Sequence, residues 1–390
     1  MDCDDIFSLM AGPPAEVSTQ DQRWDTTDEA SLEELVPSPL PPSPGADQVL
    51  PLRSEILIET ILLADVEELG DTRFNSQNHH EWAPFCVDAA GVGVSVDPEW
   101  WQGLPEKIQQ DIQDVVAVSK ADVTVPHEAE ILKKDACNLV YHAYGDGFAF
   151  ARWRQLKPLA QLVRLRRSDR FALEEISRRR VLGGSGIKGD DLEELSTELR
   201  TNIQEAIDAV GGQAFAKTAE KSAKNDTRVR PHESARSVIE ELTVSKDVLQ
   251  QSLGRGATGA RRTARYLVFQ PWDSRVHRGN EFRVIVAARQ VVGITQQCWM
   301  QFVGHTPATA AQMAQPLLRL WYEELLPLCP YHDCILDAFV DNEAAYLIEV
   351  NPCGFWGSSG GGLFHYVHDR EALLGVLDGG PLHVRVVVQE

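Results

Sequence analysis

The stretch AAYLIEVNPCG, residues 344–354, alternates as a β-strand does, yet it carries polar side chains among apolar ones. The alternation places Leu347, Glu349 and Asn351 on one face and the two β-branched residues between them on the other. A buried carboxylate without a partner is costly. We therefore expect a cation beside Glu349.

The segment CILDAFV, residues 334–340, comes just before this strand, and the short polar stretch between them predicts a β-hairpin. With a loop from Asp341 to Ala345, Asp337 lies directly opposite Glu349. Carboxylates that face each other across a ladder repel, and Asp337, Glu349 and Asn351 together match the oxygen ligands of Mg²⁺. The alternative is that Asp337 faces solvent and Glu349 pairs with an arginine.

Two further segments supply cations. GNEFRVIV, residues 279–286, places Glu281 and Arg283 on one face of a predicted strand, and QAFAKT, residues 213–218, carries Lys217 on another. A lysine, an arginine, two acids and an asparagine on successive strands are the residue types that a magnesium–triphosphate site needs. No member of this set is specific by itself.

Composition limits the possible partners. The 390 residues carry a net charge of −21, and residues 1–70 hold sixteen acidic residues against two arginines. Nucleic acid is therefore not an expected partner, and without an apolar run of 18 residues no membrane contact is expected. Seven irregularly spaced cysteines indicate a reducing, cytoplasmic location. Cys329 and Cys334 lack the second ligand pair of a zinc site.

The chain divides into an acidic, proline-rich tail over residues 1–52, expected to be disordered, and a domain over residues 53–390. A helix is predicted over 54–69, and a helical insertion over about 104–190. The segment GGSGIKGDD, residues 183–191, lacks the spacing of a phosphate loop and is predicted to be a hinge.

The remaining pattern is helical first and then rich in strands. Helices are predicted over 192–210, 232–251 and 309–326, and strands over 265–272, 281–288, 290–300, 334–340 and 345–352, besides the QAFAKT strand. These elements predict an α+β fold.

Four blocks resemble the cell division cycle protein 123 family, in the family's order. They are HHEWAPFCVDAAGVGVSV, IQEAIDAVGGQAFAKTAEKSAKND, EFRVIVAARQVVGITQQCW and LDAFVDNEAAYLIEVNPCG. The resemblance spans about residues 79–365. It implies an ATP-grasp-like fold, with two α/β lobes whose antiparallel sheets sandwich a nucleotide.

The resemblance also implies roles for single residues. It implies that Lys217 and Arg283 bind the phosphates of ATP. It implies that Gln270, Pro271 and Trp272 form a hinge against the adenine. The implied Mg²⁺ ligands are Asp337, Glu349 and Asn351. No residue is expected to be catalytic.

Two departures from the family pattern stand out. Glu349 replaces the family's usual aspartate but can still chelate. Val244 lies where a second lysine is expected, with Lys246 two positions further on, so the sequence does not say which residue supplies the second phosphate cation.

The family assembles the trimeric translation initiation factor 2 by binding its gamma subunit. The resemblance thus implies a monomeric, Mg-ATP-binding assembly chaperone. One alternative is an ATP-grasp ligase that joins a carboxylate to an amine through an acyl phosphate, and another is a binding module whose nucleotide site has decayed. The sequence does not decide whether the chain is an enzyme.

Overall fold

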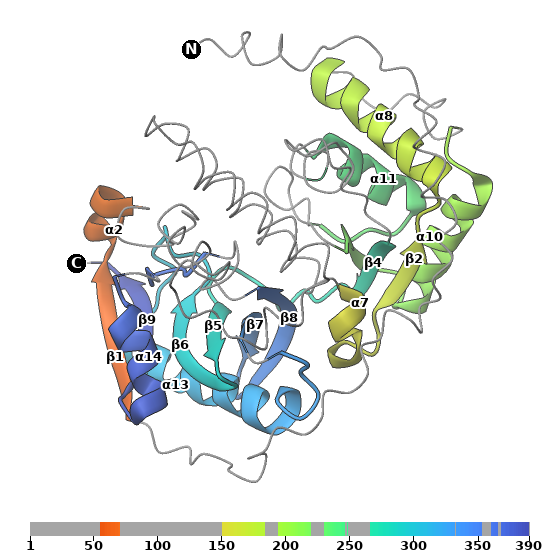
Figure 1. The fold of residues 1–390 in the computed structure, drawn as a ribbon. Helices are drawn as coiled ribbons and strands as arrows, with labels where there is room; N and C mark the ends of the chain where they lie inside the picture. The colour runs from red at the N-terminus through yellow and green to blue at the C-terminus, as the bar shows by residue number, and fades with distance from the viewer. Residues whose placement is uncertain are drawn as a thin grey trace, which may run out of the picture. The chain divides into compact units, whose positions relative to one another are not determined.

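The structure, a computed structural model, describes residues 55–70, 150–183, 194–219, 230–245, 248, 266–331, 333–352, 360–365 and 368–389. Contacts divide the chain into two units, Met1–Pro41 and Pro42–Glu390, and every described residue lies in the second. These residues form two β-sheets with helices packed against them (Figure 1). Within the described ranges, no helix has both the length and the apolar character needed to cross a membrane.

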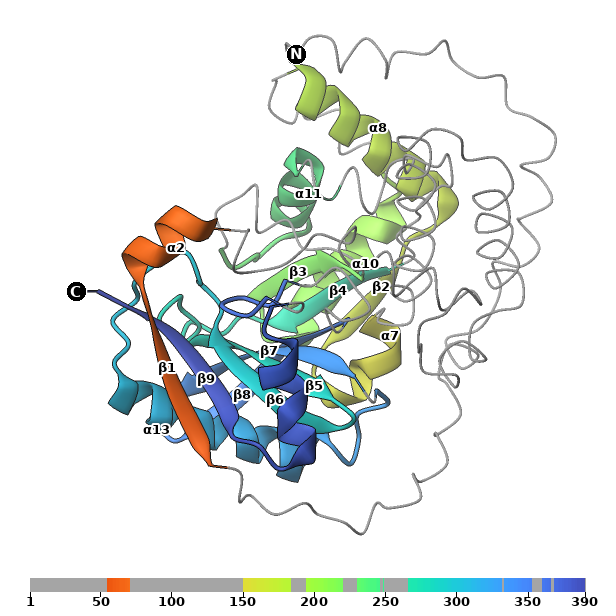
Figure 2. The same cartoon turned by 60° about the vertical axis from the view of Figure 1, so that its left-hand side comes forward.

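The larger sheet has six strands. Their order is β1 (Ile56–Leu62), β9 (Leu382–Val388), β6 (Gln290–Gln296), β5 (Glu281–Ala287), β7 (Cys334–Asp341) and β8 (Ala344–Pro352). Strand β9 runs parallel to β1 and to β6, and the other pairs are antiparallel. Figure 2 shows β1 and β9 side by side. The α+β class is confirmed, although this sheet is mixed and not purely antiparallel.

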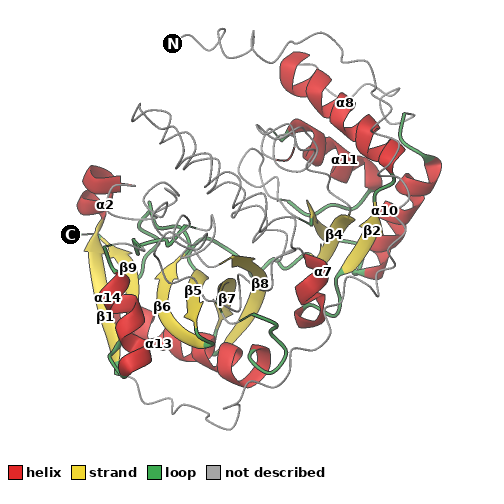
Figure 3. Ribbon diagram, in the orientation of Figure 1, coloured by secondary structure: helices red, strands yellow, loops and turns green. Residues whose placement is uncertain are grey.

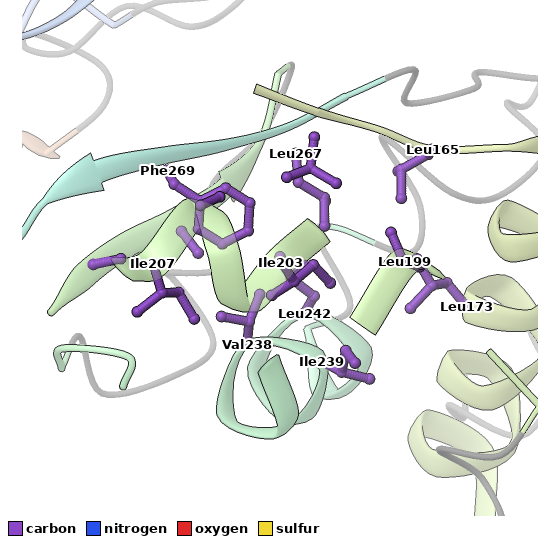
Figure 4. Close-up of a cluster of buried hydrophobic side chains, with 14 of the residues drawn as sticks. Leu165, Leu173, Leu199, Ile203, Ile207, Val238, Ile239, Leu242, Leu267 and Phe269 are labelled. Atoms are coloured by element: carbon purple, nitrogen blue, oxygen red, sulfur yellow. The ribbon is translucent and has the colours of Figure 1, made fainter. Parts of the chain in front are cut away.

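The smaller sheet is antiparallel throughout. Its order is β2 (Gln161–Arg164), β4 (Tyr266–Pro271) and β3 (Ala214–Thr218). One face packs against α8 (Arg167–Gly183), α10 (Thr197–Ala209) and α11 (Ala235–Val244). Figure 4 shows this core, in which Leu267 and Phe269 of β4 meet Ile203 and Ile207 of α10. This face is therefore closed to a ligand.

The ends of α10 follow from local chemistry. The Ser196 side chain accepts a hydrogen bond from the backbone N–H of Leu199, which begins the helix five residues after the predicted start. Gly211 and Gly212 end it with positive φ angles of 102° and 83°. The predicted glycine cap is confirmed.

Helices also cover the larger sheet (Figure 3). Helix α13 (Pro307–Arg319) continues as a π-helical segment over Leu320–Leu325 and packs against β1, β7, β8 and β9. Helix α14 (Arg370–Gly375) packs against β6 and β9. The short α7 (Phe150–Trp153) leads through a 3₁₀ turn, Arg154–Leu156, toward β2.

The β7–β8 hairpin reaches the predicted pairing by a different route. Its turn has two residues, since Asp341 pairs with Ala344, and Asn342 has a φ of 56°. That turn alone would place Ile348 opposite Asp337. A bulge between Asp337 and Ala338 skips one residue, so that Glu349 faces Asp337 as predicted. The bulge also moves Leu347 to the opposite face from Glu349, which corrects the predicted alternation.

One predicted element is wrong. The helix predicted over 54–69 is strand β1 followed by a short helix, α2 (Leu63–Leu69), because β9 offers a parallel partner to the β-branched run. Of the helical insertion predicted over about 104–190, the described residues 150–183 hold helices α7 and α8, and between them the short strand β2, which pairs with β4.

Some predictions concern residues beyond those that the structure describes. They are the tail over 1–52, the first family block, most of the hinge over 183–191, and Lys246. Strand β9 and helix α14 were not predicted from the sequence.

Candidate functional site

Asp337 and Arg283 form the centre of the candidate site. They are direct neighbours on β7 and β5. The Arg283 guanidinium donates through Nε to Oδ1 of Asp337 at 2.8 Å and through Nη2 to Oδ2 at 3.0 Å. Such a two-point pair fixes the plane of the guanidinium as well as its position. The side chains are 13% and 3% exposed, so solvent screens the pair little.

Glu349 pairs with a cation from the other sheet. Lys217 of β3 donates from Nζ to Oε2 of Glu349 at 2.7 Å, and both side chains are largely buried. This ion pair links the two sheets. It supplies the cation that the alternation of β8 predicts, although the partner is a lysine and not the arginine of the alternative interpretation.

Asn351 joins the two carboxylates. Its Nδ2 lies 3.0 Å from Oδ2 of Asp337 and 3.3 Å from Oε1 of Glu349. The side-chain amide therefore lies between two groups that would otherwise repel. The predicted set of Asp337, Glu349 and Asn351 is thus gathered at one place.

Alternation on the smaller sheet explains why Lys217 points toward the site. Ala214 and Ala216 of β3, with Leu267 and Phe269 of β4, belong to the helix-covered core. Lys217 directly follows Ala216 and pairs with Val268, which lies between Leu267 and Phe269, so Lys217 must project from the opposite face. Its register partner Val268 and the next outward residue of β4, Gln270, share that face.

The predicted hinge, Gln270 to Trp272, differs from residue to residue in the hydrogen-bond donors that it offers. Gln270 is buried, and its Nε2 has no hydrogen-bond partner among the described residues. Pro271 has no backbone N–H, and the backbone N–H of Trp272 donates to the Gln213 carbonyl at 2.9 Å. An unmet buried donor is costly, so the Gln270 amide is a position where a ligand acceptor would be favourable.

Lys157 is a second lysine at the site, and the sequence analysis did not single it out. It follows the 3₁₀ turn after α7 and donates from Nζ to the Leu347 carbonyl of β8 at 2.5 Å. Burial, followed by repulsion from Lys217, lowers its pKa to about 8, although the charges of Asp273 and Glu349 act in the other direction. No motif marks Lys157, because a contact across 190 residues leaves no local signal.

Trp153 of α7 lies against the same cations. The Lys217 Nζ is 5.9 Å from the centre of the Trp153 ring, and Trp153 is fully buried. A cation at this distance is attracted to the face of the ring. The α7 segment therefore contributes both an aromatic wall and Lys157.

The donor chemistry fits a hard divalent cation under one condition. Two carboxylates and one amide are oxygen ligands suited to Mg²⁺, and reversing the Asn351 amide would bring its oxygen to the same spot. However, all four carboxylate oxygens accept N–H donors from Lys217, Arg283 or Asn351. Two positive charges already balance two negative ones, so a metal fits only if an anion engages the lysine and the arginine.

Carboxylate, histidine and cysteine ligands alone do not form a metal centre here. Across the ranges that the structure describes, no three such side chains are arranged to hold an ion. A site at Asp337 and Glu349 would depend on Asn351 and on oxygen atoms from a ligand or water.

Comparison with known proteins finds a similarity over part of the chain. Residues 187–368 match the family model D123. A search of curated proteins gave no match. The match includes every predicted site residue from Lys217 to Asn351, but it leaves out Lys157, β1, β2 and β9.

Two kinds of solved structure are similar to the chain. Cdc123 from Schizosaccharomyces pombe has 17% sequence identity and a TM-score of 0.49, with 63% of this chain and 97% of that chain covered. Its C-terminally truncated form gives the same values. A RimK domain ATP-grasp protein from Sphaerobacter thermophilus has 17% identity and a TM-score of 0.25, with 47% and 58% of the two chains covered. The family resemblance stated from the sequence blocks is confirmed over residues 187–368 by the D123 match.

Proposed function

We propose, from the match of residues 187–368 to the D123 family model, that the chain binds Mg-ATP and acts as an assembly chaperone like the cell division cycle protein 123 family that its sequence blocks resemble. The proposal rests on two ion pairs, Lys217 with Glu349 and Arg283 with Asp337. The Asn351 amide connects them, since it donates to both carboxylates. The cluster provides cations for phosphate oxygens and oxygen ligands for a metal.

Charge balance supports a combined ligand. A metal ion alone would enter beside two cations, and a triphosphate alone would enter beside two carboxylates. If both enter together, Lys217 and Arg283 turn to the phosphate oxygens while Asp337, Glu349 and Asn351 face the metal. Mg²⁺ would then neutralise phosphate charge next to residues that have lost their own partners.

The second phosphate cation is assigned to Lys157 in this proposal. Its Nζ donates to the Leu347 carbonyl of β8, two residues before Glu349, and the charge of Lys217 lowers its pKa. An anion placed between the two lysines would relieve their repulsion. Val244, the position expected from the family pattern, is exposed at the end of α11, which packs in the closed core of the smaller sheet.

The hinge against the adenine is assigned to Gln270, Pro271 and Trp272. Gln270 shares a sheet face with Lys217, so a nucleotide whose phosphates meet Lys217 has its base toward this end of β4. The unmet Gln270 Nε2 would then donate to an acceptor on the base.

Calorimetric titration tests the nucleotide site. Removing a charge-assisted contact costs about 1.5–3 kcal/mol, so Lys217→Met and Arg283→Ala should each weaken ATP binding about ten- to hundredfold. Arg166→Ala is the matched control, because Arg166 pairs with Glu198 in an exposed bridge on the surface. Unchanged ATP affinity in both site variants would refute the assignment.

Affinity capture tests the chaperone role. By resemblance, the partner is the gamma subunit of translation initiation factor 2, and the cytoplasm is the place of assembly. Tagged protein should recover this subunit from its native cells, with recovery that differs with and without Mg-ATP. Failure to recover it under either condition, from cells that contain the subunit, would count against the partner while leaving the ATP site to be judged by titration.

A further inference from the structure

A row of polar residues crosses the larger sheet, one from each strand. In order of strand pairing, the polar row consists of Glu59, Arg385, Thr295, Arg283, Asp337 and Glu349. Cross-strand neighbours point to the same face. The row therefore connects the N-terminal strand β1 to the candidate site along one line.

Three members of the row, Arg385, Thr295 and Asp337, are buried, and a buried charge is costly unless it has a partner. Arg385 pairs with Glu59 at 2.5 Å and with Asp369 at 2.7 Å. Thr295 is fully buried. Its hydroxyl group donates to the neighbouring Gln296 carbonyl at 3.3 Å and can still accept a hydrogen bond from above the sheet.

The segment Gly360–Leu363, here called the strap, lies over the middle of the polar row. The Leu363 backbone N–H donates to Thr295 Oγ1 at 3.1 Å, and the Leu363 carbonyl accepts from Arg385 Nη1 at 3.1 Å. The Gly360 carbonyl accepts from Arg283 Nη1 at 2.5 Å. The strap thus links three of the six row positions by its backbone alone.

Glycine is required for this close approach. Gly362 has a φ of 63°, and a Cβ atom added there would lie 2.6 Å from Thr295 Cγ2. Such a distance is too short for two carbon atoms. Thr295 therefore determines, through both its methyl and its hydroxyl group, where the strap lies.

We propose that Thr295 is a positioning residue for the nucleotide site, which it influences by holding the strap against Arg283. Asp337 accepts from two donors of the Arg283 guanidinium, Nε and Nη2, and the Gly360 carbonyl accepts from a third, Nη1. A strap released from Thr295 no longer presents that carbonyl in one place. Arg283 then has to be ordered when the anion binds, and that ordering lowers affinity.

The inference rests on the proposed function, since it assigns Arg283 to the distal phosphates of ATP. AMP lacks those phosphates. A loosened Arg283 should therefore weaken ATP binding and leave AMP binding unchanged, whereas general damage to the fold would weaken both.

The test compares Thr295→Val with Thr295→Ser in the full chain, by titration with Mg-ATP and with AMP. Valine keeps the shape and loses the hydroxyl group, and serine keeps the hydroxyl group. We expect Thr295→Val to weaken ATP binding roughly three- to tenfold, with AMP affinity unchanged and with Thr295→Ser close to wild type.

Thr243→Val is the matched control. Thr243 is equally buried, and its hydroxyl group donates to the Ile239 carbonyl within α11, in the core of the smaller sheet. Loss of this buried hydroxyl group should not change the ratio of ATP to AMP affinity. A change as large as that of Thr295→Val would overturn the inference.

The outcomes separate the two proposals. Wild-type protein that binds no ATP refutes the proposed function and this inference with it. Wild-type protein that binds ATP, with an unchanged ratio of affinities in Thr295→Val, refutes the inference alone. If Thr295→Val does not fold, the alternative measurement is backbone hydrogen exchange of residues 360–365 in wild-type protein. Mg-ATP should slow this exchange, and an exchange rate that Mg-ATP does not change would overturn the inference.

Discussion

At the scale of single residues, the Lys217–Glu349 pair has two consequences that can be measured apart from any ligand. Both side chains are largely buried, so removing one partner leaves an uncompensated charge. Lys217→Met should lower the free energy of unfolding by about 3–5 kcal/mol. The double variant Lys217→Met with Glu349→Leu should cost clearly less than the sum of the single variants, as urea denaturation can show.

An exposed pair provides the control for this comparison. The Arg166 and Glu198 side chains are 59% and 52% exposed, and Arg166→Met should cost at most about 1 kcal/mol. Equal costs for Lys217→Met and Arg166→Met would mean that the Lys217–Glu349 pair is not isolated from solvent.

Lys157 should make stability depend on pH. Its pKa is about 8 in the folded protein and near 10.5 in an unfolded chain. Between these values the unfolded chain binds more protons, so the free energy of unfolding rises with pH. Below about pH 8 the lysine is charged in both states, and the full penalty of roughly 3 kcal/mol is present. It disappears as the pH approaches 10.5.

Lys157→Met removes that penalty, so the variant should gain most over wild type at pH 7 and lose the advantage by pH 10. Urea denaturation at intervals of one pH unit measures the difference. Lys217, Asp273 and Glu349 are retained in both proteins, so their own contributions to the pH dependence of stability largely cancel in the difference. A difference in stability that does not change between pH 7 and pH 10 would contradict the assigned pKa.

At the scale of elements, strand β1 stabilises the edge of the larger sheet. It is the parallel partner of β9, and its Glu59 pairs with Arg385. The Arg385 guanidinium holds the pKa of Glu59 below its usual range, although burial alone would raise it. Loss of β1 would remove both the backbone pairing and this carboxylate.

Two truncations separate β1 from the segment before it. A chain that begins at residue 53 should melt at the temperature of the full chain, because residues 1–52 have too little apolar surface for a core. A chain that begins at residue 63 should melt roughly 5–10 °C lower. Calorimetric melts that show the same loss for both chains would place the stabilising contacts before β1 instead.

The elements also show what the sequence could and could not predict. The β7–β8 hairpin was predictable, because two runs of strand-forming residues separated by a short polar turn are a local signal. The pairing of Asp337 with Glu349 was predicted from a loop of the wrong length, and a bulge compensates for the difference. Strand β1 was missed because a short apolar run fits a helix as well as a strand, and its partner β9 is more than 300 residues away.

At the scale of the whole molecule, the site depends on distant parts of the chain. The matched region, residues 187–368, holds Lys217, Arg283 and the carboxylates. Lys157 comes from the segment before that region, and Arg385 from the segment after it. The sequence blocks therefore predicted the centre of the site but not its surroundings, which depend on contacts between segments far apart in the chain.

If one cluster binds a metal and an anion together, ATP binding must depend on Mg²⁺. Asn351→Leu is the most informative variant, because it removes a predicted metal ligand and leaves both ion pairs intact. ATP should be titrated into wild-type protein and into this variant, each with Mg²⁺ and with a chelator. The account predicts that Mg²⁺ tightens ATP binding in wild type by at least about tenfold and has little effect in Asn351→Leu. Equal ATP affinity with and without Mg²⁺ in the wild-type protein would contradict it.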